Sequence, residues 1–369
     1  MKSNISSTAI VAANNAISSI TLGIDLGDKK HAVCALDASG AVLEESTIAN
    51  QRERLQKLSK KYPGARIVIE VGSHSPWISR LLESLGHEVF VANARKVRAI
   101  YTNTRKSDKV DAMMLARIGR MDPELLHPIR HRCEQAQRDL LHIRLRDNLV
   151  RQRVDIVCGV RFALKSLGIS PAKANSRTFA GQTRKLLDAS DPLLLASVAP
   201  SLQVIDILTD KIRELDRLVE QVCEESYPQT KLLRQITGVG PITSLTYVLT
   251  LGDPASFASS RDVGAYLGLV PRRDQSGAID KQLRISKTGD SYLRSLLVGS
   301  AQYILGPFGP ESDLREHGLA LAGRGGRGAK KKAVVAIARK LAVLMHALLT
   351  SGGDYQPQRQ PTAQAAQAA

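Results

Sequence analysis

Four acidic residues stand at positions from which they could bind metal ions together. Asp25 and Glu70 close the short apolar runs in LGIDLG and RIVIEVG, while Asp108 and Asp111 lie three residues apart in KSDKVDAMML. The spacing of the last two places both carboxylates on one face of a helix. Carboxylate oxygens are preferred ligands of hard cations, so the set predicts a Mg²⁺ site, with Mn²⁺ as an alternative.

A carboxylate site of this kind suits phosphodiester chemistry, because bound metal ions can neutralise the scissile phosphate and orient the reacting groups. The structural alternative is that Asp25 and Glu70 form ion pairs, while Asp108 and Asp111 stabilise a helix start. We favour the metal site because uncompensated carboxylates in buried strands are costly. DLGDKK also resembles the phosphate loop of an actin-like ATPase, but we identify no glycine-rich adenosine loop downstream of it.

Two serines beside cationic residues are candidates for a nucleophile. Ser276 follows Arg272 and Arg273 in PRRDQSG, and Ser286 precedes Lys287 in RISKTGD. A serine that attacks phosphorus needs activation and nearby positive charge. The spacing does not choose between the two serines, and a plain polar turn would also account for either of them.

The charge balance indicates a polyanionic partner. The chain has 52 Lys and Arg residues against 35 Asp and Glu residues, which gives a net charge of +17. This excess favours nucleic acid over a membrane surface. Gly238 and Gly240, in TGVGP, predict a turn between helices at which the backbone can approach a phosphate.

The four acids require a sheet and a helix to position them. Over 21–130, hairpin strands come first, from TLGIDLG through HAVCALDASG to AVLEESTIA, and a strand–helix–strand unit follows around RIVIEVG. This order predicts an α/β domain with a mixed sheet. Residues 1–20 are polar and are expected to form a flexible lead-in.

The remainder of the chain predicts mostly helical structure. Segment 131–226 is helical and arginine-rich, with a polar break over 170–191 before a long helix. Residues 227–353 predict a helical C-terminal domain with a helix-hairpin-helix-like turn and a basic loop, GRGGRGAKKK, before the last helix. A disordered low-complexity tail is expected over 354–369.

The long helix of the middle segment carries an apolar seam whose 3-4 spacing is typical of a coiled coil. The seam predicts a helical hairpin or a dimerising coil. Its residues are Ile205, Leu208, Ile212, Leu215, Val219 and Val222.

The four cysteines form no CxxC pair, which indicates a reducing compartment. The N-terminus lacks the pattern of a signal peptide, and no apolar run approaches the roughly 18 residues of a membrane span. We therefore expect a cytoplasmic, nucleoid-associated protein with no membrane segment.

Taken in order, several motifs resemble the DEDD transposases of bacterial insertion sequences, the family that includes the Piv DNA invertase and the bridge-RNA-guided recombinases. The motifs are GID, IE, KSDKVDA, GVGP, AYLGLVPRR-x-QSG and ISKTGDSYLR, and they span almost the whole chain. The resemblance implies a RuvC-like, RNase H-type fold for the first domain, with the four acids as its metal-binding tetrad. It also implies that Ser276, rather than Ser286, is the nucleophile that joins covalently to DNA.

The same resemblance implies a DNA transposase that acts on donor and target DNA and is guided by a structured RNA. It implies a homo-oligomer, a dimer or tetramer, in which a RuvC-like domain and a serine domain from different subunits complete one site. Two other functions stay open: a metal-dependent hydrolytic nuclease or junction resolvase, and a non-catalytic nucleic-acid-binding scaffold. The expected nucleic-acid contacts are Gly238, Gly240, Arg272, Arg273 and Lys287.

Overall fold

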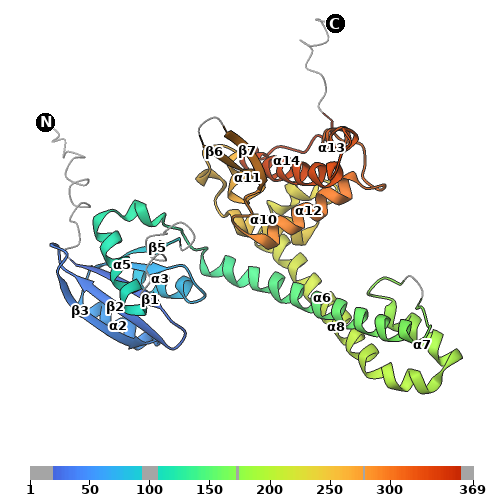
Figure 1. Ribbon diagram of the computed structural model, residues 1–369, viewed down its shortest axis with the longest axis horizontal. Coiled ribbons are helices and arrows are strands. Elements are labelled where there is room, and N and C mark those ends of the chain that lie inside the picture. Colours follow the sequence, from blue (N-terminus) through green and yellow to red (C-terminus); the bar gives the residue numbers. More distant parts are fainter. Residues whose placement is uncertain (1–19, 94–106, 172–173, 277–278, 359–369) are drawn as a thin grey trace, which may run out of the picture. The chain divides into compact units, whose positions relative to one another are not determined.

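The computed structural model describes residues 20–93, 107–171, 174–276 and 279–358 (Figure 1). The chain divides into two units, Met1–His131 and Arg132–Ala369. The first unit contains the predicted tetrad, and the second contains Ser276. The predicted lead-in before residue 20 and the predicted tail beyond residue 358 lie outside the described residues.

Five strands of the described first unit form one mixed sheet, as the sequence predicts. Their order across the sheet is β3-β2-β1-β4-β5. The pairs β1–β2 and β2–β3 are antiparallel, whereas β1–β4 and β4–β5 are parallel and need crossover connections. The strands are β1 (Thr21–Leu26), β2 (Lys30–Leu36), β3 (Val42–Ala49), β4 (Arg66–Glu70) and β5 (Glu88–Ala92).

Helices cover both faces of this sheet. They are α2 (Arg52–Lys61), α3 (Ser75–Ser84), α5 (Asp108–Met121) and the 3₁₀ turn η1 (Pro123–Leu126). Ile67 and Ile69 of β4 pack in one cluster with buried residues of α2 and α3. Val68 lies between them and packs instead with Leu115 of α5. Because successive strand residues point to opposite faces, the alternation gives this unit two apolar layers, one on each side of the sheet.

Helix α5 approaches β1 so closely that only glycine fits between them. A Cβ at Gly23 would lie 2.0 Å from the carbonyl oxygen of Ala112 and 2.5 Å from the amide nitrogen of Ala116. We expect Gly23→Ala to lower the free energy of unfolding by about 1–3 kcal/mol, measured by urea denaturation, because the helix must move away. Gly72→Ala is the matched control, since a Cβ there meets nothing within 4 Å. Equal losses in the two variants would contradict this close approach.

The first helices of the second unit are α6 (Glu134–Ser166), α7 (Phe179–Ser190) and α8 (Pro192–Glu225). Helices α6 and α8 pack in antiparallel directions. Arg146 donates a hydrogen bond to Asp216 at 2.8 Å, and Arg153 donates to Thr209 at 3.2 Å, so contacts that advance along α6 recede along α8.

The residues of the predicted seam of α8 are only partly buried in this hairpin. Ile205, Ile212 and Val219 are buried, while Leu208 and Leu215 are half-buried. Ile205 and Val219 pack in clusters that include residues of α6. A coiled coil between subunits stays a prediction.

The expected polar break over 170–191 contains helix α7, so that part of the prediction is wrong. Phe179, Thr183 and Leu187 recur every four residues and are buried, and Phe179 and Leu187 pack with apolar residues of α6 and α8. The buried residues of α7 are few and stand among polar ones, so the helical period is not evident in its sequence.

The C-terminal part of the second unit is mostly helical, as predicted. Tyr247 is fully buried in its core, where its hydroxyl donates to the carbonyl of Ala342 at 2.5 Å. One feature was not predicted, an antiparallel two-stranded sheet formed by β6 and β7. The elements are α9 (Thr230–Arg234), α10 (Pro241–Leu251), η2 (Pro254–Ser256), α11 (Asp262–Tyr266), β6 (Pro271–Ser276), β7 (Ile279–Ile285), α12 (Ser291–Leu305), α13 (Asp313–Gly323) and α14 (Ala329–Ser351).

Helices α8 and α14 are long and apolar enough to cross a membrane by length and composition alone. One or two such helices are weak evidence for a membrane protein, because a core helix of a soluble protein can pass the same test. Helix α14 is such a helix, because Ile337, Leu341 and Met345 are fully buried in the C-terminal core. These two helices therefore do not indicate a membrane protein.

Candidate functional site

The register of the sheet brings Asp25 and Glu70 to one edge. Ile24 of β1 pairs with Ile69 of β4 in parallel, so the next residue on each strand is one of the two acids. The carboxyl ends of parallel neighbours meet at the same edge, and both acids are half-buried there. Strand pairing therefore makes them neighbours despite their separation in sequence.

Helix α5 carries the other two acids to the same edge. Its first residues follow Ser107, whose hydroxyl accepts a hydrogen bond from the amide of Val110 at 3.4 Å, so neither aspartate is the cap. The last turn of α5 lies over the start of β4, because Arg66 donates to the carbonyl of Gly119 at 3.1 Å. The first turn must then lie toward the carboxyl ends of the strands.

The two aspartates of α5 differ in environment. Asp108 is exposed, whereas Asp111 is only 6% exposed and its Oδ1 atom makes no hydrogen bond within the described chain. A buried carboxylate oxygen without a partner is costly, and a divalent cation is the kind of partner that would compensate it. The donor set thus fits a hard cation. Among the described side chains, however, no group of three or more His, Cys, Asp or Glu residues lies close enough to hold a metal ion.

Two histidines near this edge were not singled out from the sequence. His74 lies 3.2 Å from Asp28, in the turn that follows β1. His31 is fully buried beside that turn, and burial lowers the pKa of its imidazole. Neither residue stands in a motif with ligand spacing, so the sequence held no signal for them.

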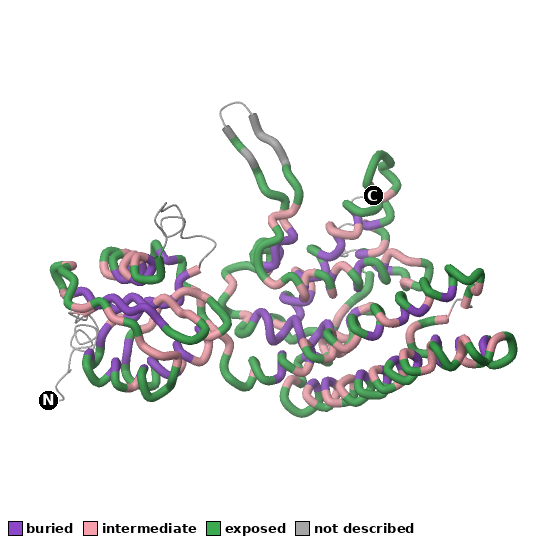
Figure 2. The backbone as a smooth tube through the Cα atoms, turned by 60° about the horizontal axis from the view of Figure 1, so that its bottom comes forward, coloured by how far each residue is buried: buried purple, intermediate pink, exposed green. Residues whose placement is uncertain are grey.

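In the second unit, Ser276 is the last residue of β6, and its backbone pairs with Ile279 of β7. Its side chain lies outside the described part of the chain. Figure 2 shows β6 and β7 as a ribbon whose described residues are largely exposed. Arg272 and Arg273 are exposed on the same strand, where the register shifts by one residue. The ribbon thus brings both arginines onto the strand that ends at the predicted nucleophile.

Lys287 follows β7 in a backbone conformation that is rare for a side chain of its kind. Its φ is +56°, in the left-handed region that favours glycine. The amide of Lys287 donates to the carbonyl of Gly268 at 3.1 Å, which anchors the turn. The hydroxyl of the rival serine, Ser286, lies 3.0 Å from that of Thr288.

The glycines of TGVGP have different roles. Gly238 has a φ of +92°, and a Cβ there would lie 3.3 Å from the carbonyl oxygen of Ser300, so the turn sits tightly on α12. Gly240 caps the start of α10 and is exposed, and a Cβ there would meet nothing within 4 Å. A ligand therefore has room at Gly240.

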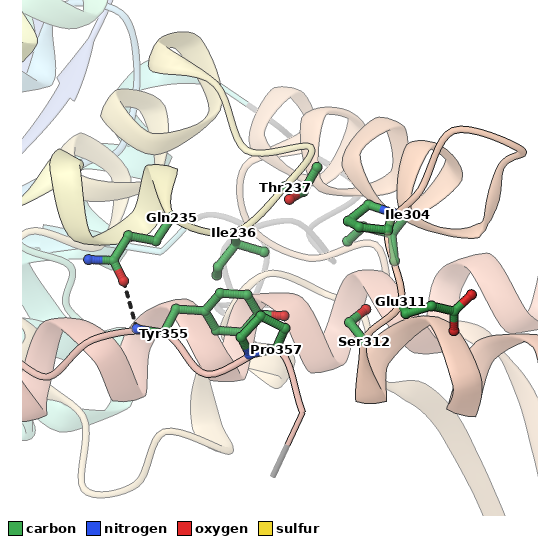
Figure 3. Close-up of a pocket in the computed structure, with 9 residues that line it drawn as sticks. Gln235, Ile236, Thr237, Ile304, Glu311, Ser312, Tyr355 and Pro357 are labelled. Atoms are coloured by element: carbon green, nitrogen blue, oxygen red, sulfur yellow. Dashed lines mark hydrogen bonds between the residues drawn. The ribbon is translucent and has the colours of Figure 1, made fainter. Parts of the chain in front are cut away.

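A cavity of about 120 Å³ lies beside this turn (Figure 3). Thr237 lines it together with Tyr355 and Pro357 from the segment after α14. Gln235 holds that segment, because its side-chain oxygen accepts from the amide of Tyr355 at 2.7 Å. The first residues of the expected tail are thus docked on the C-terminal core rather than disordered.

Two family models match the chain. The first, a DEDD transposase model, matches residues 22–169, and the second, described as transposase IS116/IS110/IS902 family, matches residues 230–313. The first match includes all four tetrad residues, and the second includes Ser276.

Curated relatives cover most of the chain. A putative transposase of Sinorhizobium fredii is 31% identical over 306 residues, which is 82% of this chain and 78% of the relative. The transposase for insertion sequence element IS1111A of Coxiella burnetii is 26% identical over 90% of both chains. A pilin gene-inverting protein of Moraxella bovis is 32% identical over 145 residues, which is 38% of this chain and 44% of that protein.

Proposed function

The chain belongs to the IS116/IS110/IS902 family of transposases and is a DNA transposase, and on this premise we propose that it cuts and rejoins DNA through a covalent phosphoserine at Ser276. The observation that supports the proposal is that strand pairing makes Asp25 and Glu70 neighbours at one edge of the mixed sheet, toward which the first turn of α5 also points. Asp111 contributes most to it, because it is buried and its Oδ1 atom makes no hydrogen bond with the residues that the structure describes.

The proposed chemistry conserves the number of phosphodiester bonds. The Oγ atom of Ser276 attacks phosphorus and loses its proton, the bond from phosphorus to one sugar oxygen breaks, and that oxygen takes up a proton. A hydroxyl of another strand then attacks the phosphoserine, and the serine is regenerated. Arg272 and Arg273 would stabilise the negative charge that develops on the phosphate oxygens.

The tetrad would bind Mg²⁺, which supplies a positive charge that neutralises the phosphate. Asp25 and Glu70 suit this task because strand pairing fixes their backbone positions. Asp108 is exposed and open to an arriving substrate, while Asp111 contributes from the interior.

The proposal extends to partners. The net charge of +17 fits a complex with a structured RNA that specifies the donor and target DNA. Sequencing the RNA that co-purifies with the full chain tests this part. We expect one structured species encoded beside the gene, and a random sample of cellular RNA would contradict it.

The covalent step can be tested directly. The protein is incubated with Mg²⁺ and a nicked DNA that releases a short fragment, so that rejoining is blocked and an adduct accumulates. Peptide mass spectrometry should find the nucleotide on Ser276. Cleavage without an adduct would favour a hydrolytic resolvase, and an adduct on another residue would refute the assignment.

A further inference from the structure

The start of α14 and the turn before it carry cations without acidic neighbours in sequence. Between Glu316 and Asp354 the chain has seven Lys and Arg residues and no Asp or Glu. Five of them lie together and are here named the α14 basic cluster: Arg324, Arg327, Lys330, Lys331 and Lys332.

All members of the α14 basic cluster are exposed, and none makes an ion pair or side-chain hydrogen bond with another described residue. Some other exposed cations of the described chain are paired. Arg138 contacts Glu134 at 2.5 Å, and Lys211 contacts Glu214 at 2.9 Å. The cluster is therefore a concentration of positive charge that the described chain leaves uncompensated.

The three lysines occupy the end of a helix where cations are unfavourable. Helix α14 begins after Gly328, with no side-chain cap and no acid in its first turn. The positive end of the helix dipole lies there and repels lysine. Helix α13 shows the usual arrangement, because Ser312 caps it and Asp313 lies in its first turn. Three lysines at the start of α14 thus cost stability in the free protein, and a bound anion would offset that cost.

The positive charge of this region also acts on helix α13. Burial, together with the charges of Lys340 and Arg324, lowers the pKa of His317 on α13. The turn itself is open, since a Cβ at Gly325, or at Gly326 after it, would meet nothing within 4 Å. A large polyanion can therefore approach the backbone and the side chains together.

We propose that the α14 basic cluster is a docking surface for the phosphate backbone of nucleic acid. It contains none of the residues assigned to cleavage, and it lies beyond residues 230–313 that the family model matches. The inference rests on the proposed function only for the nature of the partner. DNA and RNA present the same phosphates, so both serve as probes.

The test compares the full chain with the triple variant K330Q/K331Q/K332Q. Fluorescence anisotropy with a short labelled DNA duplex, and separately with a labelled hairpin RNA, gives Kd at several salt concentrations. On the probe that the cluster contacts, the slope of log Kd against log salt should fall by about 2–3, because each lost phosphate contact removes slightly less than one counterion. Binding at low salt should weaken by roughly ten- to a hundredfold.

The same variant should have an unchanged or higher Tm when free, because unfavourable charges are removed from a helix start. Loss of binding without loss of Tm separates this surface from a folding defect. Binding is measured without Mg²⁺ and without cleavage, so failure here is distinguishable from failure of the serine chemistry. The pair R324Q/R327Q, in the turn outside the helix, should lower the slope as well.

The matched control removes three exposed lysines from other helices, K57Q/K60Q/K185Q, and should change the slope by less than about one. The triple Lys→Arg variant of the cluster should bind as the unchanged chain does. An unchanged slope on both probes, or an equal fall in the control, would overturn the proposal. The proposal would also be overturned, in favour of a membrane surface, if the triple variant K330Q/K331Q/K332Q lost binding to phosphatidylserine vesicles but kept its binding to both nucleic acids.

Discussion

Replacing Ser276 with alanine is expected to abolish covalent protein–DNA adducts and to lower strand joining by more than about a thousandfold, as removal of a nucleophile does in other enzymes. The substitution deletes one hydroxyl and leaves the backbone pairing with Ile279 possible. Binding of DNA and RNA should therefore persist. Denaturing gels detect the adducts, and labelled donor and target strands report joining.

Ser286→Ala is the matched control for this prediction. Ser286 lies just after β7, and its hydroxyl contacts Thr288 at 3.0 Å, so its loss should leave adduct formation intact. Persistent adducts in the Ser276→Ala protein would refute the nucleophile assignment. Full cleavage without adducts would instead favour a metal-dependent hydrolytic nuclease, and no cleavage by either protein would favour a scaffold.

The α/β unit was predictable from its sequence because its strands are short apolar runs that turn signals separate. Helix α7 and the β6–β7 ribbon were not predictable from the sequence, for a physical reason. The ribbon sequence PRRDQS has no apolar alternation, and its position depends on backbone contacts. Ser286, for example, donates from its amide to the carbonyl of Val270 at 2.9 Å. Backbone hydrogen bonds of this kind cannot be inferred from the pattern of apolar and polar side chains.

That the four acids bind metal stays a prediction, but the sheet edge at which Asp25 and Glu70 become neighbours was predictable from the sequence. The difference between exposed Asp108 and buried Asp111 was not. That difference depends on how closely α5 approaches β1, and Gly23 permits the approach. A glycine inside an apolar strand signals a close backbone neighbour, so Gly23 could have indicated the contact.

The burial of Asp111 gives the second large prediction, Asp111→Asn. If Asp111 is a metal ligand, its loss should lower strand transfer by more than about a hundredfold, because even outer-shell partners of a metal cost ten- to a hundredfold. Without metal, the free energy of unfolding should change by only about 1 kcal/mol. Removing a negative charge from the start of a helix lowers the free energy of unfolding, whereas removing the buried charge of an unpartnered carboxylate raises it. The two effects therefore partly cancel.

Metal-dependent stability separates the ligand from a helix-stabilising residue. Saturating Mg²⁺, at about a hundred times its Kd, should raise the free energy of unfolding of the unchanged chain by about 2.7 kcal/mol, and Asp111→Asn should lose most of this gain. Glu53→Gln is the control, because Glu53 is an exposed acid in the first turn of α2. It should lose some helix stability but keep the full response to Mg²⁺. If Asp111→Asn also keeps that response and its activity, Asp111 serves the helix alone and the tetrad is not a metal site.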